Sequence, residues 1–264
     1  RCLGYTGEYR VVSNGVDFAK GRVAPEKVAK VTDSYDLPEG IPVFLFVGRI
    51  VKYKGLPLIL DALAKLSQDG VDFRMVFVGS GPDEKEMKEK AASLLKPEQY
   101  IFTGAVYDRE QLRAWNTRAD LFLFPSTYDT NGIVVREAAA CGLASVLIGG
   151  SCAAEGITDD RNGFLIEENA DSMAALLAKL CHEPEVLKRV GRQAQEEIYI
   201  SWDDAVHRAQ RRYEIVIEQY RSCGSAHRRF SDEYYQSLGM CIDVLKRSRE
   251  RLREQWDAFA EHFQ

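Results

Sequence analysis

Two carboxylates flank the start of an Ala-rich apolar segment at residues 128–142, YDTNGIVVREAAACG. Asp129 precedes the apolar run, and Glu137 follows about one turn into the helix that this composition predicts. The first free N–H groups of such a helix, near Asn131 and Gly132, form a site for an anion. Two acids beside an anion are unfavourable unless they accept hydrogen bonds from neutral hydroxyls, so we expect a sugar or a ribose there. The alternatives are that Asp129 only caps the helix and that Glu137 is a solvated helix residue.

A cationic loop, GRIVKYKG at residues 48–55, follows the first apolar burst of the chain. Gly48 lets the backbone approach a ligand, and Arg49 and Lys54 place two cations on one loop ahead of a predicted helix. This combination suits a diphosphate. The alternative is a pair of solvated side chains, because lysine and arginine are mostly exposed in proteins.

Two further loops carry weaker signals. GSGPDEK, at residues 79–85, lacks the third glycine of a dinucleotide fingerprint, and we expect Pro82 to open the next helix. The segment therefore indicates a tight strand-to-helix turn that brings backbone near a nucleotide. GAVYD, at residues 104–108, either exposes backbone around Val106 to a base edge or is simply a turn into a helix capped by Asp108.

These loops follow short apolar bursts that are rich in β-branched or aromatic residues, as is typical of buried parallel strands. The bursts cover residues 43–47, 73–78, 100–103, 121–124, 145–148 and, as a sixth strand, 163–166. Helix-period segments alternate with them at residues 56–66, 83–95, 108–117 and 134–141. The alternation predicts an α/β fold, a Rossmann-like doubly wound parallel sheet whose ligands bind beyond the carboxyl ends of the strands.

The pattern is helical from Asp171 onward. One predicted helix ends before Pro184, a second follows it, and a third begins after Ser201 as its N-cap. Gly and Ser interrupt the helical pattern at residues 222–229. We therefore expect a ligand-binding domain with its terminal helices over residues 1–221 and a helical tail over residues 222–264.

The tail is amphipathic. One face is apolar, through Leu238, Ile242, Leu245, Leu252, Trp256, Phe259 and Phe263. Beside it the sequence KRSRERLR carries five cations and one acid, which suits an anionic membrane surface or an acidic partner. The alternative is that this face packs on its own domain or on a protein half that is absent from this chain.

The composition excludes several classes of protein. The 264 residues are 45% hydrophobic, and a net charge of −5 without a basic stripe argues against nucleic-acid binding. Six cysteines without regular spacing suit reduced thiols in the cytosol. No apolar run reaches the length of a membrane span, and the sequence starts without Met. We expect a piece of a longer cytoplasmic protein, peripheral at most at the inner face of a membrane.

The order of these motifs resembles one known family. Gly48-Arg49 with Lys54-Gly55, then FPS, then two acids separated by seven residues, then EAAACG resembles the sugar-donor half of family 4 glycosyltransferases, which are retaining enzymes of the GT-B fold. The resemblance covers most of residues 10–221. VVSNGVDF, at residues 11–18, is similar to the segment with which the family enters this domain.

The resemblance implies a role for each loop. Arg49 and Lys54 would hold the diphosphate of a nucleoside-diphosphate sugar, and Glu137 would accept hydrogen bonds from the ribose hydroxyls. Asp129 would contact the transferred sugar, and the amides near residues 131–133 would serve both sugar and phosphate. The expected catalytic residues are Arg49, Lys54 and Asp129, and the expected sugar-donor contacts are these three with Gly48, Val106, Asn131, Gly132, Ile133 and Glu137.

Two features depart from the family pattern. The first acid of the family is usually Glu followed by Gly-Phe-Gly, whereas Asp129 is one methylene shorter and precedes Thr130, Asn131 and Gly132. The acceptor half, with the histidine it usually contributes, is missing from this sequence. The histidines present, His182, His207, His227 and His262, all lie in the helical last third and away from the loops above.

The implied activity is retaining transfer of a hexose from a nucleoside-diphosphate sugar, with a UDP-sugar favoured, to a saccharide or lipid acceptor such as those of a bacterial cell envelope. We expect no cofactor and no metal, because no cluster has ligand spacing and cations with a helix N-terminus can carry the diphosphate charge. The expected partners are the sugar donor, an N-terminal acceptor domain, and a membrane surface or packing partner for residues 230–264. Without that acceptor domain the chain should not transfer sugar. The alternatives are a binding module without catalysis and an epimerase of the GT-B fold.

Overall fold

The computed structural model describes residues 12–130, 132–222, 238–240, 242–244, 246–247 and 249–250. The chain divides into two compact units, Arg1–His207 and Arg208–Gln264. The division expected from the sequence, at residues 1–221 and 222–264, stays a prediction.

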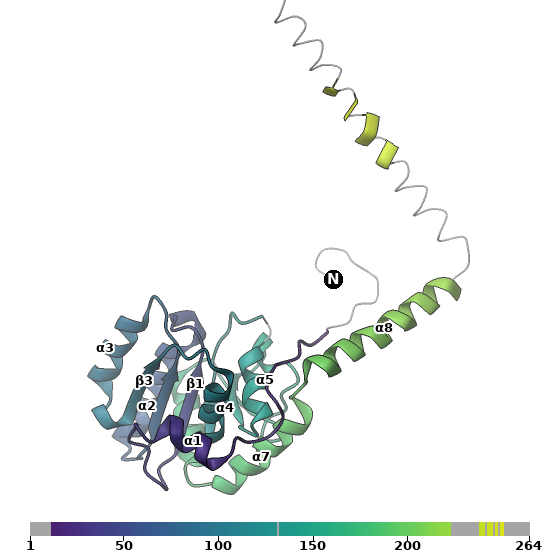
Figure 1. Cartoon of the computed structure of the whole chain (residues 1–264). Coiled ribbons are helices and arrows are strands. Elements are labelled where there is room, and N and C mark those ends of the chain that lie inside the picture. Colours follow the sequence, from purple (N-terminus) through teal and green to yellow (C-terminus); the bar gives the residue numbers. More distant parts are fainter. Residues whose placement is uncertain are drawn as a thin grey trace, which may run out of the picture. The chain divides into compact units, whose positions relative to one another are not determined.

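The first unit is built on a parallel sheet of six strands (Figure 1). The strands are β1 (Val43–Val47), β2 (Arg74–Val78), β3 (Tyr100–Gly104), β4 (Leu121–Leu123), β5 (Ser145–Ile148) and β6 (Phe164–Ile166). Their order in the sheet is β3-β2-β1-β4-β5-β6, so the direction of winding reverses between β1 and β4. This confirms the predicted α/β doubly wound fold.

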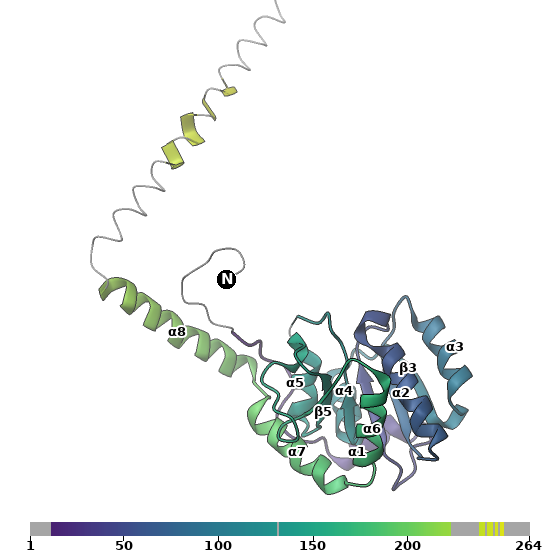
Figure 2. The ribbon, with the colours of Figure 1, turned by 180° about the vertical axis from the view of Figure 1, so that it is seen from behind.

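Helices cover both faces of the sheet (Figures 1 and 2). They are α1 (Pro25–Thr32), α2 (Leu56–Gln68), α3 (Glu84–Leu94), α4 (Arg109–Arg118), α5 (Ile133–Ala140), α6 (Ala170–Leu180) and α7 (Pro184–Glu197), with single 3-10 turns at Lys52–Lys54, Pro97–Gln99 and Cys152–Ala154. On one face α2 packs against α3 and α6, and on the other α4 packs against α1 and α5. Right-handed crossovers produce this arrangement when the winding reverses in mid-sheet.

Burial on both faces explains why the strands appear in the sequence as continuous apolar runs. Every residue of β1, β2, β4 and β5 is buried, whereas β3, at the edge of the sheet, is half-buried throughout. Each predicted strand is present with its ends displaced by at most one residue, and the four predicted crossover helices agree within two residues. Helix α1 was not predicted, because its eight residues carry a short pattern and contact with α4 positions it.

The predicted Ser201 cap is confirmed, and the Asp108 cap, one of the two alternatives for its loop, is present. The Asp108 carboxylate accepts a hydrogen bond from the Gln111 N–H at 2.9 Å, at the start of α4. The Ser201 hydroxyl accepts one from the Asp204 N–H at 3.1 Å, at the start of α8 (Trp202–Ser222). Each side chain satisfies an N–H group that the first helical turn leaves without a partner.

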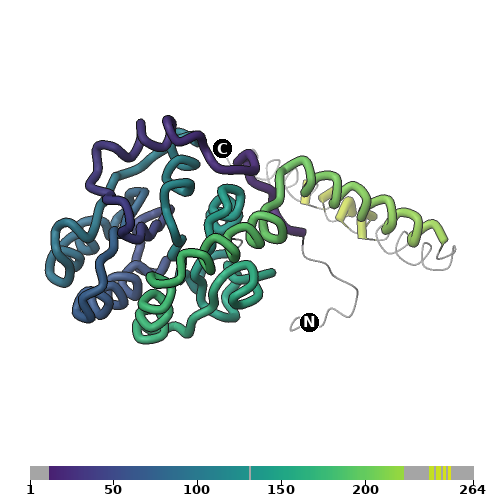
Figure 3. The backbone as a smooth tube through the Cα atoms, turned by 90° about the horizontal axis from the view of Figure 1, so that it is seen from below, coloured from purple at the N-terminus to yellow at the C-terminus, as the bar shows by residue number. Residues whose placement is uncertain are grey.

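The first described residues lie beside the segment that leads to α8. The Val16 N–H donates to the Ile200 carbonyl at 3.0 Å, and the Tyr199 hydroxyl donates to the Phe18 carbonyl at 3.0 Å. Figure 3 shows the purple start of the described chain crossing the green chain at this point. Phe18 is buried there, so the segment at residues 12–18 joins the first unit.

Only part of the predicted amphipathic tail is described. Leu238 and Ile242, of its apolar face, are exposed, whereas Leu245, Leu252, Trp256, Phe259 and Phe263 lie outside the described residues. Burial of this face on protein or membrane therefore stays a prediction. Among the described residues, no helix has the length and apolar character needed to cross a membrane.

Candidate functional site

The strongest predicted site residues follow β1 and β4, the neighbouring strands at which the winding of the sheet reverses. The chain leaves β1 toward α2 on one face and leaves β4 toward α5 on the other. The loops therefore diverge beyond the carboxyl ends of the strands, which is where open parallel sheets bind ligands.

Lys54 and Asp129 meet at this point. The Lys54 Nζ atom lies 3.0 Å from Asp129 Oδ2, and both side chains are largely buried, at 17% and 21% exposed. The Lys54 Nζ atom also lies 5.3 Å from the centre of the Phe124 ring, in a cation–π contact. Arg49 is exposed, and no acid among the described residues pairs with it. The loop thus presents one paired cation and one that faces solvent.

Backbone contact fixes the distance between the two loops. Gly55 has a φ of 82°, and a Cβ atom placed on it would lie 2.2 Å from the Pro125 carbonyl oxygen. Only glycine accepts both the left-handed backbone and this approach without strain. The backbone contact between Gly55 and Pro125 therefore holds the adjacent residue Lys54 in place. This positions the Lys54–Asp129 pair.

The GSGPDEK segment supports the cationic loop. A Cβ on Gly79 would lie 1.9 Å from the Gly48 carbonyl oxygen, and one on Gly81 would lie 2.2 Å from the Ile50 carbonyl oxygen. The Ile50 N–H donates to the Ser80 carbonyl at 3.0 Å, which joins the two loops further. The segment is a tight turn, as expected. The prediction that Pro82 opens the helix is wrong, because α3 begins two residues later.

Glu137 is buried on α5 and is paired. Its side chain is 10% exposed, and Oε1 accepts a hydrogen bond from the Arg109 guanidinium at 2.8 Å. Arg109 in turn donates to Asp17 at 3.2 Å and lies over the Phe18 ring. The alternative that Glu137 is a solvated helix residue is therefore wrong. Burial raises the pKa of the Glu137 carboxyl, although the Arg109 charge acts in the opposite direction.

Asp129 does not cap α5. The N-cap is Gly132, with a φ of 54°, and it has no side chain to bond the helix N–H groups. Ile133 begins the helix and is exposed, so the first turn is accessible to a ligand. Asn131 lies outside the described residues, and Val106 is half-buried against the core in the loop that follows β3. The structure thus gathers Lys54, Asp129 and the start of α5, and it leaves Val106 on a neighbouring loop.

Arg109 and Asp17 are the members of this region that the sequence did not indicate. Arg109 follows the cap of α4, where a cation has no special meaning, and Asp17 lies in the segment at residues 12–18. The histidines, which were not predicted as site residues, lie elsewhere: His182 and His207 are exposed on the helical part of the chain, and His227 and His262 lie outside the described residues. Within the described ranges, no group of three or more His, Cys, Asp or Glu side chains is arranged to hold a metal ion.

Comparison with known proteins gives one family. The model of the glycosyl transferases group 1 matches residues 29–197, well over half of the chain. A 2-deoxystreptamine glucosyltransferase of Streptomyces kanamyceticus is 34% identical over 145 residues, which are 54% of this chain and 37% of that protein. A GDP-mannose-dependent alpha-(1-6)-phosphatidylinositol dimannoside mannosyltransferase of Mycobacterium tuberculosis is 30% identical over 179 residues, 68% of this chain and 45% of the relative. The chain thus spans less than half the length of these curated relatives.

Solved structures agree on the fold. Anabaena Alr3699/HepE, in complex with UDP and glucose, superposes with a TM-score of 0.65 at 20% identity, over 79% of this chain and 57% of the other. The C-terminal domain of a glycosyl transferase group 1 family protein, LpcC, from Francisella tularensis superposes with a TM-score of 0.57 at 21% identity, over 71% of this chain and 94% of that domain. The neighbours are glycosyltransferases of the GT-B fold.

Proposed function

The chain belongs to the glycosyl transferases group 1 family, and we propose that it is the sugar-donor-binding half of a retaining hexosyltransferase whose acceptor half is absent from this chain. The observation that carries the proposal is the meeting of Lys54 and Asp129, 3.0 Å apart, where the winding of the sheet reverses. The Glu137 carboxylate, on the helix that leaves the same point, adds a buried acceptor for hydroxyl groups.

We assign the diphosphate to Arg49, Lys54 and the N-terminus of α5. When the bond to the sugar breaks, negative charge builds on the phosphate oxygens while the sugar becomes oxocarbenium-like. Fixed cations and free helix N–H groups lower the energy of that charge without having to reorganise. Lys54 is held by the backbone at Gly55, so its position suits this role.

A bound diphosphate would compete with Asp129 for Lys54, because one ammonium group serves both anions. Asp129, once its pairing with Lys54 weakens, is then free to accept a hydrogen bond from a hydroxyl of the transferred sugar. We assign the ribose hydroxyls to the Glu137 carboxylate, which Arg109 holds through Oε1. Retention follows if the acceptor attacks from the face that the diphosphate leaves.

We favour a UDP-sugar as the donor. One structural neighbour was solved with UDP and glucose, whereas one relative is named for GDP-mannose. Calorimetric titration with UDP, GDP and ADP tests the choice: the proposal expects UDP to bind most tightly. Absence of binding by all three would overturn the assignment of this site to a nucleoside diphosphate.

We also propose that donor binding is independent of metal ions, because two cations and a helix N-terminus already supply positive charge. The UDP affinity should therefore be the same in EDTA and in Mg²⁺. A large loss of affinity in EDTA would contradict this.

Transfer should need the missing half of the enzyme. The attacking hydroxyl must be held about 3–3.5 Å from the anomeric carbon, which takes groups on both sides of the cleft. The test is to incubate this chain, and separately the full-length enzyme, with the donor and an acceptor that the full-length enzyme uses. Comparable transfer rates would contradict the split site, and interconversion of the donor sugar without acceptor would indicate an epimerase instead.

We place the enzyme in the cytoplasm, with residues 230–264 on an anionic membrane surface or a protein partner. Several relatives are named for lipid acceptors, such as phosphatidylinositol dimannoside, which suits a saccharide or lipid acceptor of the cell envelope. Sedimentation of the chain with anionic and with neutral vesicles separates the two surfaces: a charge-dependent shift into the pellet supports the membrane, and its absence supports packing on protein.

A further inference from the structure

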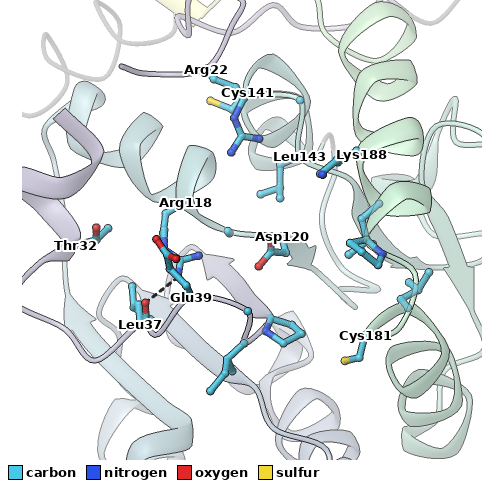
Figure 4. A pocket seen from close by; sticks show the side chains of 18 of the residues that line it. Arg22, Thr32, Leu37, Glu39, Arg118, Asp120, Cys141, Leu143, Cys181 and Lys188 are labelled. Atoms are coloured by element: carbon cyan, nitrogen blue, oxygen red, sulfur yellow. Dashed lines mark hydrogen bonds between the residues drawn. The ribbon is translucent and has the colours of Figure 1, made fainter. Parts of the chain in front are cut away.

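A cavity of about 1110 Å³ opens at the opposite end of the sheet, where β1, β4 and β5 begin (Figure 4). All of its lining residues lie between positions 22 and 195, within the first unit. Binding sites for small molecules are commonly about 300–1,000 Å³, so the cavity holds a ligand of metabolite size with room for water. None of the residues assigned to the sugar donor lines it.

Asp120 lies at the centre of this cavity. One carboxylate oxygen, Oδ2, accepts a hydrogen bond from the Val43 N–H at 2.9 Å. The other oxygen has no hydrogen-bond partner in the part of the chain that the structure describes. Arg22, Arg118 and Lys188 surround the carboxylate closely enough to act on its charge, yet none forms an ion pair with it. Surrounding protein atoms raise the pKa of the Asp120 carboxyl, although its side chain remains accessible from the cavity.

Each of the two arginines donates a hydrogen bond to a backbone carbonyl. Arg118 donates through Nη2 to the Leu37 carbonyl at 3.0 Å, the contact drawn as a dashed line in Figure 4. Arg22 donates through Nη2 to the Thr117 carbonyl. A guanidinium group has five N–H donors, so one anchoring bond fixes its direction and leaves further donors for an anion.

Lys188 supplies a third cation from α7. Its ion pair with Glu185, at 2.9 Å, joins two side chains that are mostly in solvent, and such a pair is weak. An anion in the cavity therefore competes easily for the ammonium group. The half-buried Leu37 and Pro42 also line the cavity and offer an apolar contact.

Two observations select the class of ligand. The free oxygen of Asp120 is accessible in the cavity and can accept a hydrogen bond from a ligand hydroxyl, which adds no charge, and the arginines with Lys188 attract an anion such as phosphate. The C–H face of a sugar ring suits the apolar contact with Leu37 and Pro42. We propose that this cavity is a second binding site, for a sugar monophosphate, separate from the site for the sugar donor.

Thiol chemistry is not part of this site. Cys141 and Cys181 line the cavity, and burial raises the pKa of each thiol to about 11. Both therefore stay protonated and unreactive near neutral pH. We assign ligand binding to the Asp120 carboxylate and the three cations; Asp33, Glu39 and Arg192 also line the cavity.

The test is calorimetric titration of the chain with glucose 6-phosphate, with inorganic phosphate and with glucose, each in the presence of saturating UDP. We expect glucose 6-phosphate to bind at least about tenfold more tightly than phosphate, because the hydroxyl contact with Asp120 adds one charge-assisted hydrogen bond. Equal affinities, or complete competition by UDP, would overturn the proposal. The same titrations are repeated on the Arg49→Ala/Lys54→Ala variant, whose sugar-donor site is disabled. Glucose 6-phosphate should bind this variant as it binds wild type, so the result does not depend on whether UDP binds.

Substitutions locate the site. Arg118→Gln with Lys188→Gln should weaken glucose 6-phosphate binding about tenfold or more, whereas Lys85→Gln, on the exposed side of α3, should leave it unchanged. Urea denaturation checks that the double variant folds.

Asp120→Asn retains an acceptor for the Val43 N–H, so this variant should fold, and it provides a second test of the site. It should lower the ratio of glucose 6-phosphate affinity to phosphate affinity about fivefold, while phosphate itself binds no worse because a negative charge is gone. An unchanged ratio, or an equal loss for both ligands, would contradict the role of Asp120.

Discussion

The charged side chains at the two ends of the sheet differ in how they are paired. At the carboxyl end Lys54 pairs with Asp129 and Arg109 pairs with Glu137. At the amino end three cations surround Asp120 without touching it. A ligand at the carboxyl end must therefore compete with Asp129 for Lys54, whereas a ligand at the amino end can bridge Asp120 and the arginines and has only the exposed Lys188–Glu185 pair to displace. The comparison predicts substitution effects that differ in sign as well as in size.

The largest effect should come from removing both cations of the carboxyl end. Arg49→Ala with Lys54→Ala should cost about 3–6 kcal/mol of UDP binding, as two charge-assisted hydrogen bonds are lost, and much less of uridine binding. Lys52→Ala is the matched control, since Lys52 lies on the same loop but pairs with Glu86. Calorimetry with both ligands measures the difference, and an equal loss for UDP and uridine would indicate misfolding rather than phosphate contact.

The next effect concerns the contact that positions Lys54. Gly55→Ala should lower the free energy of unfolding by about 2–4 kcal/mol, because it adds a clash with Pro125 to the strain of a left-handed backbone. Gly70→Ala is the control: its φ is 79° but no atom lies within 4 Å of the added Cβ, so it should cost only about 1 kcal/mol. Urea denaturation measures both, and equal losses would show that the Pro125 contact does not matter.

Glu137→Gln should weaken UDP binding by about 1.5–3 kcal/mol, since the amide keeps the shape but loses the charge-assisted bond to the ribose. Binding of inorganic pyrophosphate, which has no ribose, serves as the control and should change little. Unchanged UDP affinity in this variant would remove Glu137 from the site.

Asp129→Asn should weaken the competition between residue 129 and a bound diphosphate for Lys54. A neutral amide holds Lys54 less tightly, so UDP should bind about 0.5–1 kcal/mol more tightly, while UDP-glucose gains less or loses affinity because the sugar contact is weakened. Asp17→Asn, which disturbs a more exposed pair with Arg109, is the control. Equal weakening of both ligands would contradict the exchange of partners at Lys54.

The smallest effect should appear at the amino end. Burial raises the pKa of Asp120 above its usual value of 3.8, so the folded state holds a proton that the unfolded state has released. Between 3.8 and the raised pKa the wild-type chain therefore loses stability as pH rises. Asp120→Asn lacks this loss, so its stability relative to wild type should rise across that window. Urea denaturation at a series of pH values measures the gain, and a difference that stays constant with pH would contradict it.

The strands and helices of the doubly wound sheet could be predicted because local patterns mark them. VFLFV, the sequence of β1, is apolar at every position since helices cover both faces of that strand. Lys54 and Asp129 were each predicted as site residues because each follows a strand, whereas the pairing of β1 with β4 and the contact between the two side chains come from the structure. Their roles in binding stay predictions until the variants are measured.

The other contacts of the site, and the cavity at the amino end, could not be predicted because they depend on tertiary packing. Arg109 reaches Glu137 only because α4 and α5 pack side by side, and no spacing in the sequence joins the two residues. The cavity at the amino end draws Arg22, Asp120 and Lys188 from three distant segments, none of which carries a motif. Local patterns cannot indicate a site of this kind, since its members share only a position in space.

The close backbone contacts among the loops also limit how such a protein can diverge. Gly55, Gly79 and Gly81 each lie against a carbonyl oxygen or backbone atom of another loop. A longer side chain or an added residue in one loop must therefore be matched by a change in its neighbour, so these loops evolve together or stay the same. Tyr128 and Tyr107 are exposed on the loops after β4 and β3; Tyr128 contacts another loop only through its ring, which lies edge-on to that of Tyr53. Relatives that differ in the sugar or nucleotide they use should differ first at those two positions.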